Sequence, residues 1–165
     1  MKKWIGAWLL VFVLTGCRAV ETFESLGNVE HISPGPARLR QVVVSLPSNA
    51  ALETVGMDTE VTVYHCGNFD MVLQNFSSGD LSGSIRSLCG FSADQLTVME
   101  TTCGDHTRHE WVWTAVSEEG EMVCRGAILD DGDHHYALYV MAPSAEAGAL
   151  QSQWNALFAS FCLEN

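Results

Sequence analysis

The stretch HEWVWTAVSEEGEMVCRGAILDDGDHHYALYVM, residues 109–141, contains three apolar runs separated by two short acidic segments. The runs are rich in Trp, Tyr, Val and Ile, the residue types that favour β-strands. We expect three strands, at 109–116, 121–129 and 134–141. The segments between them, SEEG and DDGD, have the length and composition of hairpin loops. The stretch therefore predicts an antiparallel meander.

Loops of four residues fix the register of this meander and place Cys124 opposite Trp113 on one side and Tyr139 on the other. A further hairpin before it would place Cys103 near Arg108, roughly 16 Å along the strand direction from the level of Cys124. Because a disulfide needs Cα atoms within about 7 Å of each other, we expect no bond between Cys103 and Cys124. Cys124 is predicted to be a buried free thiol that packs as a small hydrophobic side chain.

A helix is predicted to follow the meander, from Ser144 as its N-cap to Phe161, with Glu146 in its first turn. Its apolar residues recur at the spacing of one helix face. They are Leu150, Trp154, Leu157, Phe158 and Phe161. We expect this helix to lie across the sheet, with Trp111 and Trp113 packed beneath it as core. If that face is instead partly open, the two rings would line an apolar binding surface.

The chain before the meander has the pattern of further short strands and one helix. Strands are expected at 41–46, 60–66, 69–76 and 96–102. A short helix is expected at 78–90, with Gly90 at its C-terminal cap. An antiparallel sheet covered by helices makes an α+β domain.

The C-terminal half resembles a known arrangement. The segment EWVWTAVSEEGEMVCRGAILDDGDHHYALYVMAP, followed by WNALFASF, resembles the PsbP-like fold, in which a terminal helix ending in a Ser-Phe motif, here Ser160-Phe161, covers a meander. The resemblance spans roughly residues 40–163 and rests on strands and aromatic residues. It implies an α/β/α sandwich of a kind that mostly serves as a non-enzymatic binding or assembly module, although a fold by itself does not transfer a ligand.

The first residues have the pattern of an export signal. Met1-Lys2-Lys3 is a short positive segment, and an apolar run follows at 4–14. As a helix this run would reach roughly 16 Å, about half of a bilayer's hydrocarbon core, so it is too short to span a membrane stably. Its length is that of a signal-peptide core.

The end of the apolar run resembles the lipobox of bacterial lipoproteins, an aliphatic residue and two small residues before a cysteine, here Leu14-Thr15-Gly16-Cys17. The resemblance implies cleavage between Gly16 and Cys17 and a diacylglyceryl thioether on the Cys17 thiol, with fatty acids such as palmitate holding the protein on the exported face of the cell membrane. The alternative is an uncleaved anchor or a chance cysteine. The predicted organisation is a signal peptide at 1–16, a lipidated N-terminus and tether at 17–38, and a single α+β domain at 39–165.

The charge of the chain excludes one class of partner. The whole sequence has a net charge of −12, and both lysines lie within 1–16, so cleavage would leave −14. A lysine-free anionic domain lacks the basic surface that nucleic-acid binding needs. The expected partners are the membrane, through the lipid on Cys17, and a protein or small molecule that the sequence does not identify.

Two groups of acidic and histidine residues suggest a metal. In the first, His134 and His135 follow the acidic loop, but consecutive strand residues point to opposite faces of a sheet, and the loop lacks calcium-binding spacing. In the second, His109-Glu110 begins like a zinc-protease motif, yet Trp113 stands where the second histidine belongs, and nearby His106 is expected in a loop. We predict no metal and no cofactor.

Signatures of nucleophilic catalysis are also missing from the sequence. There is no G-x-S-x-G motif, and without lysine after cleavage there is no P-loop or S-x-x-K pair. His65 and Cys66 are neighbours on a strand and should point apart. We predict no catalytic residue and a non-catalytic binding or interaction role, the alternative being a metal- or thiol-dependent envelope enzyme that uses the His, Asp and Cys groups.

The cysteines leave the disulfide pattern open. Five remain besides Cys17, namely Cys66, Cys89, Cys103, Cys124 and Cys162. Export usually brings a chain into an oxidising compartment, where at most two bridges could form and one thiol would be left over.

Overall fold

The computed structural model describes residues 38–53, 61–77, 80–118 and 120–164. The predicted signal peptide, Cys17 and almost all of the predicted tether lie outside these residues. Within them, no helix is long and apolar enough to cross a membrane.

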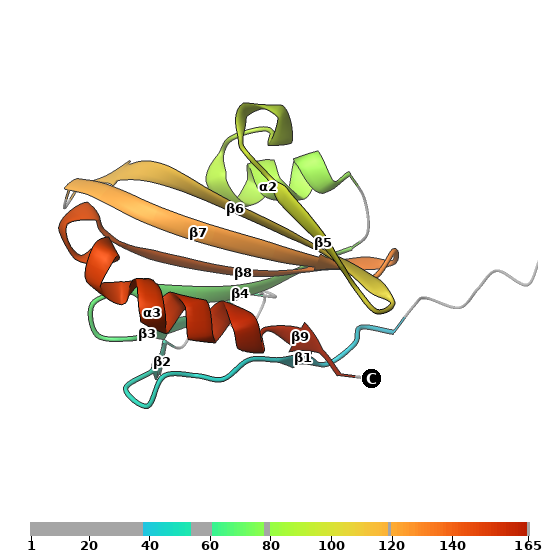
Figure 1. The fold of residues 1–165 in the computed structure, drawn as a ribbon, viewed down its shortest axis with the longest axis horizontal. Helices are drawn as coiled ribbons and strands as arrows, with labels where there is room; N and C mark the ends of the chain where they lie inside the picture. The colour runs from blue at the N-terminus through green and yellow to red at the C-terminus, as the bar shows by residue number, and fades with distance from the viewer. Residues whose placement is uncertain (1–37, 54–60, 78–79, 119, 165) are drawn as a thin grey trace, which may run out of the picture. The chain divides into compact units, whose positions relative to one another are not determined.

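The centre of the domain is an antiparallel sheet of seven strands in the order β2-β3-β4-β8-β7-β6-β5. The strands are β2 (Ala51–Glu53), β3 (Val61–His65), β4 (Asp70–Ser77), β5 (Met99–Cys103), β6 (His106–Ser117), β7 (Gly120–Asp130) and β8 (His134–Pro143). β6, β7 and β8 lie side by side as the predicted meander, and β5 pairs with β6 at one edge of the sheet (Figure 1). The α+β fold class is confirmed.

The register of the meander is confirmed on one side of β7 and wrong on the other. Cys124 pairs with Trp113 of β6 as predicted, but on the β8 side it pairs with Met141, two residues beyond Tyr139. The turn is centred later than the composition suggests, because the Asp131 carboxylate accepts hydrogen bonds from the backbone N–H groups of Asp133 and His134. A shift of two residues keeps every side chain on its predicted face of the sheet.

The hairpin between β5 and β6 is also tighter than predicted. Cys103 pairs with His106, not with Arg108. Gly104 lies in the turn with a φ of 67°, a left-handed conformation that glycine adopts without strain, so two residues suffice to reverse the chain.

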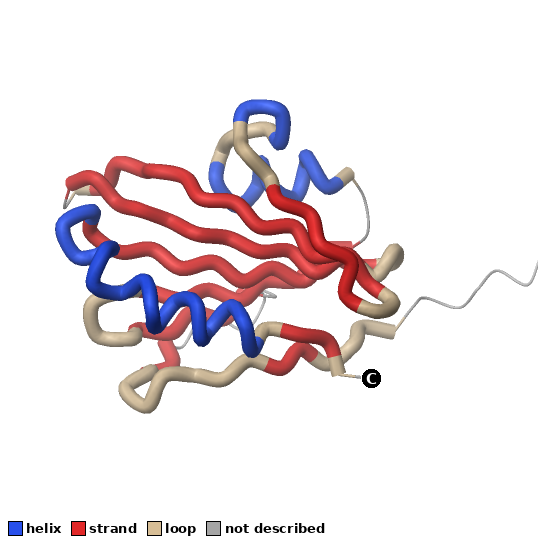
Figure 2. Tube along the Cα trace, viewed as in Figure 1, coloured by secondary structure: helices blue, strands red, loops and turns tan. Residues whose placement is uncertain are grey.

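Two helices cover the sheet, one on each face (Figures 1 and 2). α2 (Leu81–Cys89) is capped by the Asp80 side chain and ends at Gly90, whose φ of 80° confirms the predicted C-terminal cap. α3 (Ser144–Ser160) begins at Ser144 itself, so Ser144 is not the predicted N-cap. Pro143, the last residue of β8, occupies the cap position because its ring fixes a φ suited to leaving a strand.

The two helices define two cores. On the α3 face, α3 packs on apolar residues of β4 and β8, with Trp154, Phe158 and Tyr136 among the buried side chains. On the α2 face, Ile85 of α2 packs with Trp111, Trp113, Cys124 and Ile128. Trp111 and Trp113 therefore lie under α2, and the expectation that the last helix covers them is wrong. Strand alternation turns them away from the face that α3 occupies.

Short elements complete the domain. A single 3₁₀ turn, η1 (Ala93–Gln95), leads into β5. Two-residue strands β1 (Val42–Val43) and β9 (Cys162–Leu163) form a separate antiparallel pair that joins the two ends of the described chain. β1 replaces the longer strand expected at 41–46, and β2 and β9 were not anticipated.

Candidate functional site

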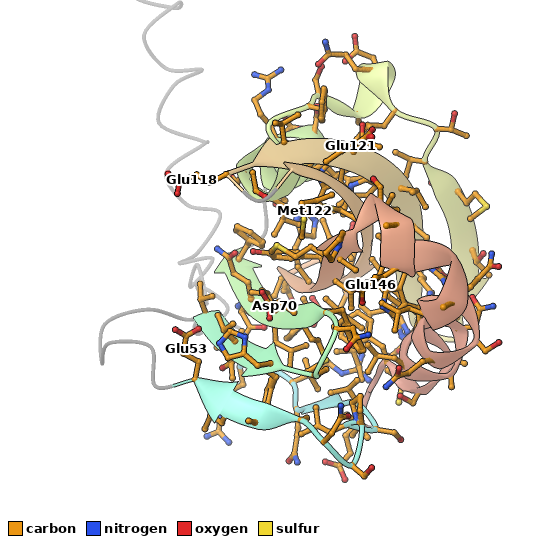
Figure 3. The ribbon with its side chains drawn as sticks, turned by 90° about the vertical axis from the view of Figure 1, so that its left-hand side faces the viewer. Glu53, Asp70, Glu118, Glu121, Met122 and Glu146 are labelled. Atoms are coloured by element: carbon orange, nitrogen blue, oxygen red, sulfur yellow. The ribbon has the colours of Figure 1, made fainter. Side chains whose placement is uncertain are left out.

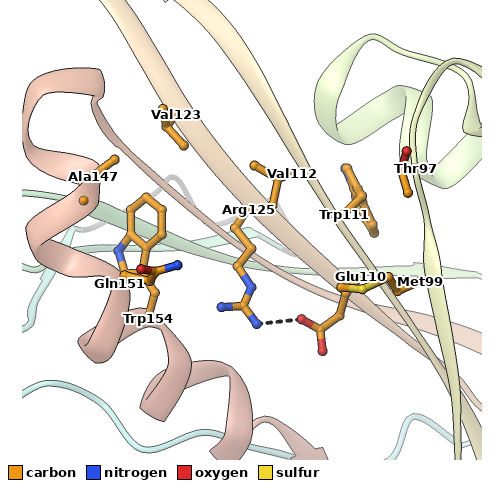
Figure 4. A pocket seen from close by; sticks show the side chains of 11 residues that line it. Thr97, Met99, Glu110, Trp111, Val112, Val123, Arg125, Ala147, Gln151 and Trp154 are labelled. Carbon is orange, nitrogen blue, oxygen red and sulfur yellow. Dashed lines mark hydrogen bonds and ion pairs between the residues drawn. The ribbon is translucent and has the colours of Figure 1, made fainter.

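A cavity of about 550 Å³ lies between α3 and the strands β5, β6 and β7 (Figure 4). We call it the α3 groove. It is lined by Thr97, Met99, Glu110, Trp111, Val112, Val123, Arg125, Ala147, Gly148, Gln151 and Trp154. Its volume falls in the range of small-molecule sites, about 300–1,000 Å³.

The groove exists because α3 packs mainly on β7 and β8 and leaves part of the same face of β5 and β6 uncovered. Val112 of β6 and Met99 of β5 are consequently 57% and 60% exposed. On the helix side, Ala147 and Gly148 are too small to fill the space at one end of the groove, and Gln151 and Trp154 line it further along α3. The walls are thus apolar apart from a few polar side chains, and they rest on a regular helix and sheet.

One wall of the groove carries an ion pair. Arg125 Nη2 donates to Glu110 Oε2 at 2.8 Å, and Arg108 Nε donates to Glu110 Oε1 at 2.6 Å. Burial alone would raise the pKa of Glu110, but the hydrogen bonds and charges of the two guanidinium groups outweigh it and lower the pKa. Glu110 therefore stays ionised at neutral pH.

The same arginines fasten α3 to the sheet. Arg108 donates to the backbone carbonyls of Phe158 at 2.8 Å and Phe161 at 3.0 Å. Both carbonyls lie at the C-terminus of α3, where the usual helical partner four residues on is missing, although that of Phe158 also accepts from the Phe161 N–H at 3.2 Å. Arg125 donates to Asn155 Oδ1 at 2.7 Å and lies 4.3 Å from the centre of the Phe158 ring. The charged wall of the groove is held in place by the helix it faces.

Trp111 and Trp113, the predicted candidates for a binding surface, have buried rings. They are 1% and 8% exposed and stack with 6.1 Å between ring centroids. Gly126 on β7 makes room for them, since a Cβ there would lie 2.8 Å from Trp111 Cζ2. The rings are core, as in the first of the two interpretations. The residue between them, Val112, is exposed and points to the other face.

The predicted histidine and acid groups do not converge on a metal site. Among the described residues, no three His, Cys, Asp or Glu side chains are placed to hold one ion. His134 lies beside the Tyr136 ring, whereas the neighbouring His135 lies under α2, so the two occupy opposite faces as predicted.

Ser84, His135 and Asp130 form a line of hydroxyl, imidazole and carboxylate on the α2 face. Ser84 Oγ lies 2.8 Å from His135 Nδ1, and His135 Nε2 lies 3.5 Å from Asp130 Oδ2. Ser84 is only 7% and His135 only 2% exposed, so a substrate would be shielded from both. The contact instead gives α2 a polar attachment to the sheet.

The five cysteines within the described residues are free thiols. Cys103 and Cys124 are unbonded, and Cys124 is buried beside Trp113, both as predicted. Burial raises the pKa of the Cys124 thiol to about 11, with a smaller contribution from Cys89. A protonated, buried thiol is a poor nucleophile.

Acidic side chains gather at one end of the molecule, near the tip of the β6–β7 hairpin and the start of α3 (Figure 3). Asp70 and Glu146 line a shallow hollow there with Met122. Glu121 lies on the same end, at the start of β7.

Comparison with solved structures supports the fold. No protein-family model matches the sequence, and no curated protein does. Cyanobacterial PsbP (CyanoP) from Synechocystis sp. PCC 6803 is similar with a TM-score of 0.55 and 8% identity, over 84% of this chain and 99% of that protein. A protein from Bacteroides thetaiotaomicron has a TM-score of 0.50 and 11% identity over 75% of this chain, which spans 45% of that protein. LpqN, involved in cell envelope biogenesis of Mycobacterium tuberculosis, has a TM-score of 0.49 and 12% identity over 82% of this chain and 88% of LpqN.

The domain therefore has a PsbP-like fold, with one helix on each face of an antiparallel sheet. Sequence reasoning reached this fold but missed the α3 groove. A signal was present, since Arg125 is a charged residue in the apolar middle of β7.

Proposed function

We propose that this chain is a lipid-anchored protein of the cell envelope whose PsbP-like domain binds an apolar ligand, without catalysis, in the α3 groove. The anchoring part rests on the residues Leu14-Thr15-Gly16-Cys17 and the short positive and apolar segments before them. The binding part rests on the groove itself.

The observation that carries the binding function is an apolar cavity with two half-exposed side chains, Met99 and Val112, on rigid elements. Covering such surface stabilises a complex by about 25 cal/mol per Å² of apolar area removed from water. The sheet and α3 are already in place, so little ordering opposes the gain.

The charges of the groove favour binding over catalysis. Its acid, Glu110, accepts hydrogen bonds from two arginines and has a lowered pKa, so it neither donates a proton at neutral pH nor is free to accept one. The rival, an enzyme using the His, Asp and Cys groups, would need Ser84 and His135 to become accessible beneath α2.

Replacement of the lipobox cysteine tests the anchoring. In Cys17→Ala no thioether can form. In cells supplied with radioactive palmitate, the wild-type protein should be labelled, whereas the variant should carry no label and should not be cleaved between Gly16 and residue 17. Label retained by Cys17→Ala would overturn the anchoring.

Methyl NMR of the full chain tests the groove. With ¹³C-labelled Met and Val methyl groups, small apolar fragments should cause saturable shifts at Met99 and Val112. Val116 is a matched control, since it is an exposed valine of the same strand but lies outside the groove lining. Shifts that are equal at Val112 and Val116, or that never saturate, would overturn the binding function.

A further inference from the structure

The α3 groove combines an apolar surface with a cation that has hydrogen-bond donors to spare. A guanidinium carries five N–H donors. Among the described residues, Arg125 donates to Asn155 through Nη1 and to Glu110 through Nη2. Its side chain is 22% exposed, and in Figure 4 it lies in the middle of the groove, between Gln151 and Trp154 on α3 and Glu110 on β6.

The local charge is opposite to that of the chain. Arg108 and Arg125 flank a single carboxylate, Glu110, so the three side chains together carry one positive charge. The whole sequence carries −12. Repulsion by distant surface acids is screened beyond about 8 Å at physiological salt, whereas a direct contact with Arg125 is not.

From this geometry we infer that the ligand of the α3 groove is an anionic single-chain amphiphile, a long-chain fatty acid, with its carboxylate on Arg125 and its hydrocarbon tail along Val112, Val123 and Ala147. The inference rests on the proposed binding function and names the ligand class. A carboxylate matches the planar donor fork of arginine, and a methylene chain matches the apolar walls.

The acidic end of the molecule sets the direction of the ligand. The apolar walls run from Arg125 toward Val123 and Ala147 (Figure 4), which are close in sequence to Glu121 and Glu146. Both of these carboxylates lie on the acidic end shown in Figure 3. A carboxylate head placed at that end would meet like charges, so the tail points toward it and the head stays at Arg125.

Photo-crosslinking of the full, membrane-reconstituted protein tests the inference. The probes are palmitic acid with a diazirine near its methyl end and the hexadecanol with the same group, which has the same tail but no charge. Peptide mapping should place the acid on Val112, Val123 or Ala147. Labelling by the alcohol should be at least tenfold weaker, in keeping with the strength of a charge-assisted hydrogen bond.

Two pairs of variants separate head from tail. Arg125→Gln, which leaves Glu110 paired with Arg108, should lower the ratio of acid to alcohol labelling about tenfold, whereas Arg86→Gln on α2 should leave that ratio unchanged. Val112→Glu should abolish labelling by both probes, whereas Val116→Glu should not. Val112 is exposed, so Val112→Glu should fold. It therefore tests the position of the tail even if Arg125→Gln does not fold.

The outcomes are distinguishable. Equal labelling by acid and alcohol, with Arg125→Gln like the wild type, overturns the fatty-acid inference but leaves an apolar groove that binds, as in the proposed function. Labelling confined to residues outside the groove overturns the inference as well, and the proposed function is then decided by the methyl shifts of Met99 and Val112.

Discussion

The two faces of strand β6 differ in how completely they are covered. On the α2 face, Trp111 and Trp113 stack under α2 and over Gly126, and the Ser84 hydroxyl lies within hydrogen-bond distance of His135. On the α3 face, Val112 stands half in solvent beside an ion pair. Neighbouring residues of one strand thus belong to a closed core and to an open groove.

The contrast teaches where to look for function in a small sandwich of this kind. The conspicuous aromatic pair stabilises the fold, and the less conspicuous valine between them faces the surface where a ligand can bind. Substitutions on the two faces should therefore separate stability from binding.

The largest effect is expected at Trp111. Trp111→Ala would leave a cavity in the α2 face and should lower the free energy of unfolding by about 3–5 kcal/mol. Urea denaturation followed by circular dichroism measures it. A loss below about 1 kcal/mol would mean that the α2 face is not closely packed.

A smaller loss is expected at Gly126. Its new Cβ in Gly126→Ala would meet the rigid Trp111 ring at 2.8 Å, and overpacking of this kind costs about 1–3 kcal/mol. Gly148→Ala is the matched control, because nothing lies within 4 Å of its added Cβ and alanine favours a helix by up to about 1 kcal/mol. If both variants shift the urea midpoint in the same direction, the close approach at Gly126 is not what limits packing.

The stability of the α2 face should depend on pH through the buried side chain of His109. Burial lowers the pKa of His109 despite the nearby Glu100 and Asp130 carboxylates, and His135 lowers it further. The unfolded chain then binds a proton more readily than the native one, so stability should fall as the pH drops below about 6.5 and level off below the native pKa.

Unfolding of the wild type and His109→Gln between pH 7.5 and 5 measures this, and the variant should lose part of the slope. His65 is the control, since its hydrogen bond to Asp70 raises its pKa and any stability it adds is lost as the pH rises above 6.5. His65→Gln should therefore keep the acid slope. An unchanged slope in His109→Gln would contradict the assignment.

The smallest effect on stability is expected at Val112. Val112→Thr keeps the β-branched shape on a half-exposed position and should change the free energy of unfolding by no more than about 0.5 kcal/mol. Apolar fragments should nevertheless bind the groove more weakly, as read from the Met99 methyl shift. A destabilisation like that of Trp111→Ala would show that the α3 face is as closed as the α2 face.

The meander could be predicted because its strands alternate and its loops are made of turn residues. The β7–β8 register was missed by two residues because the Asp131 side chain, not composition, selects the turn. The two-residue strands β1 and β9 carry no periodicity to detect, so long-range pairing alone defines them.

The site was harder to predict than the fold. Alternation separates Trp111 from Val112 but does not say which helix covers which face, and both sides of β6 offer apolar residues. The α3 groove depends on how far α3 reaches across the sheet, which follows from the contacts of Arg108 and Arg125 with the helix. The sequence does reveal one residue of the groove, because Arg125 is a charge in the apolar middle of β7.

The tight turns have a consequence for the order of folding. β5, β6, β7 and β8 follow one another as hairpins, so each pairing closes a short loop at low entropic cost. The β4–β8 ladder instead joins Ser77 to His134 across the chain that forms α2 and three strands. Local pairings form fastest, so the four hairpin strands should make the nucleus. β4 would then add to the β8 edge, which already exists, and a chain still lacking β4 would expose β8 to any other unpaired strand.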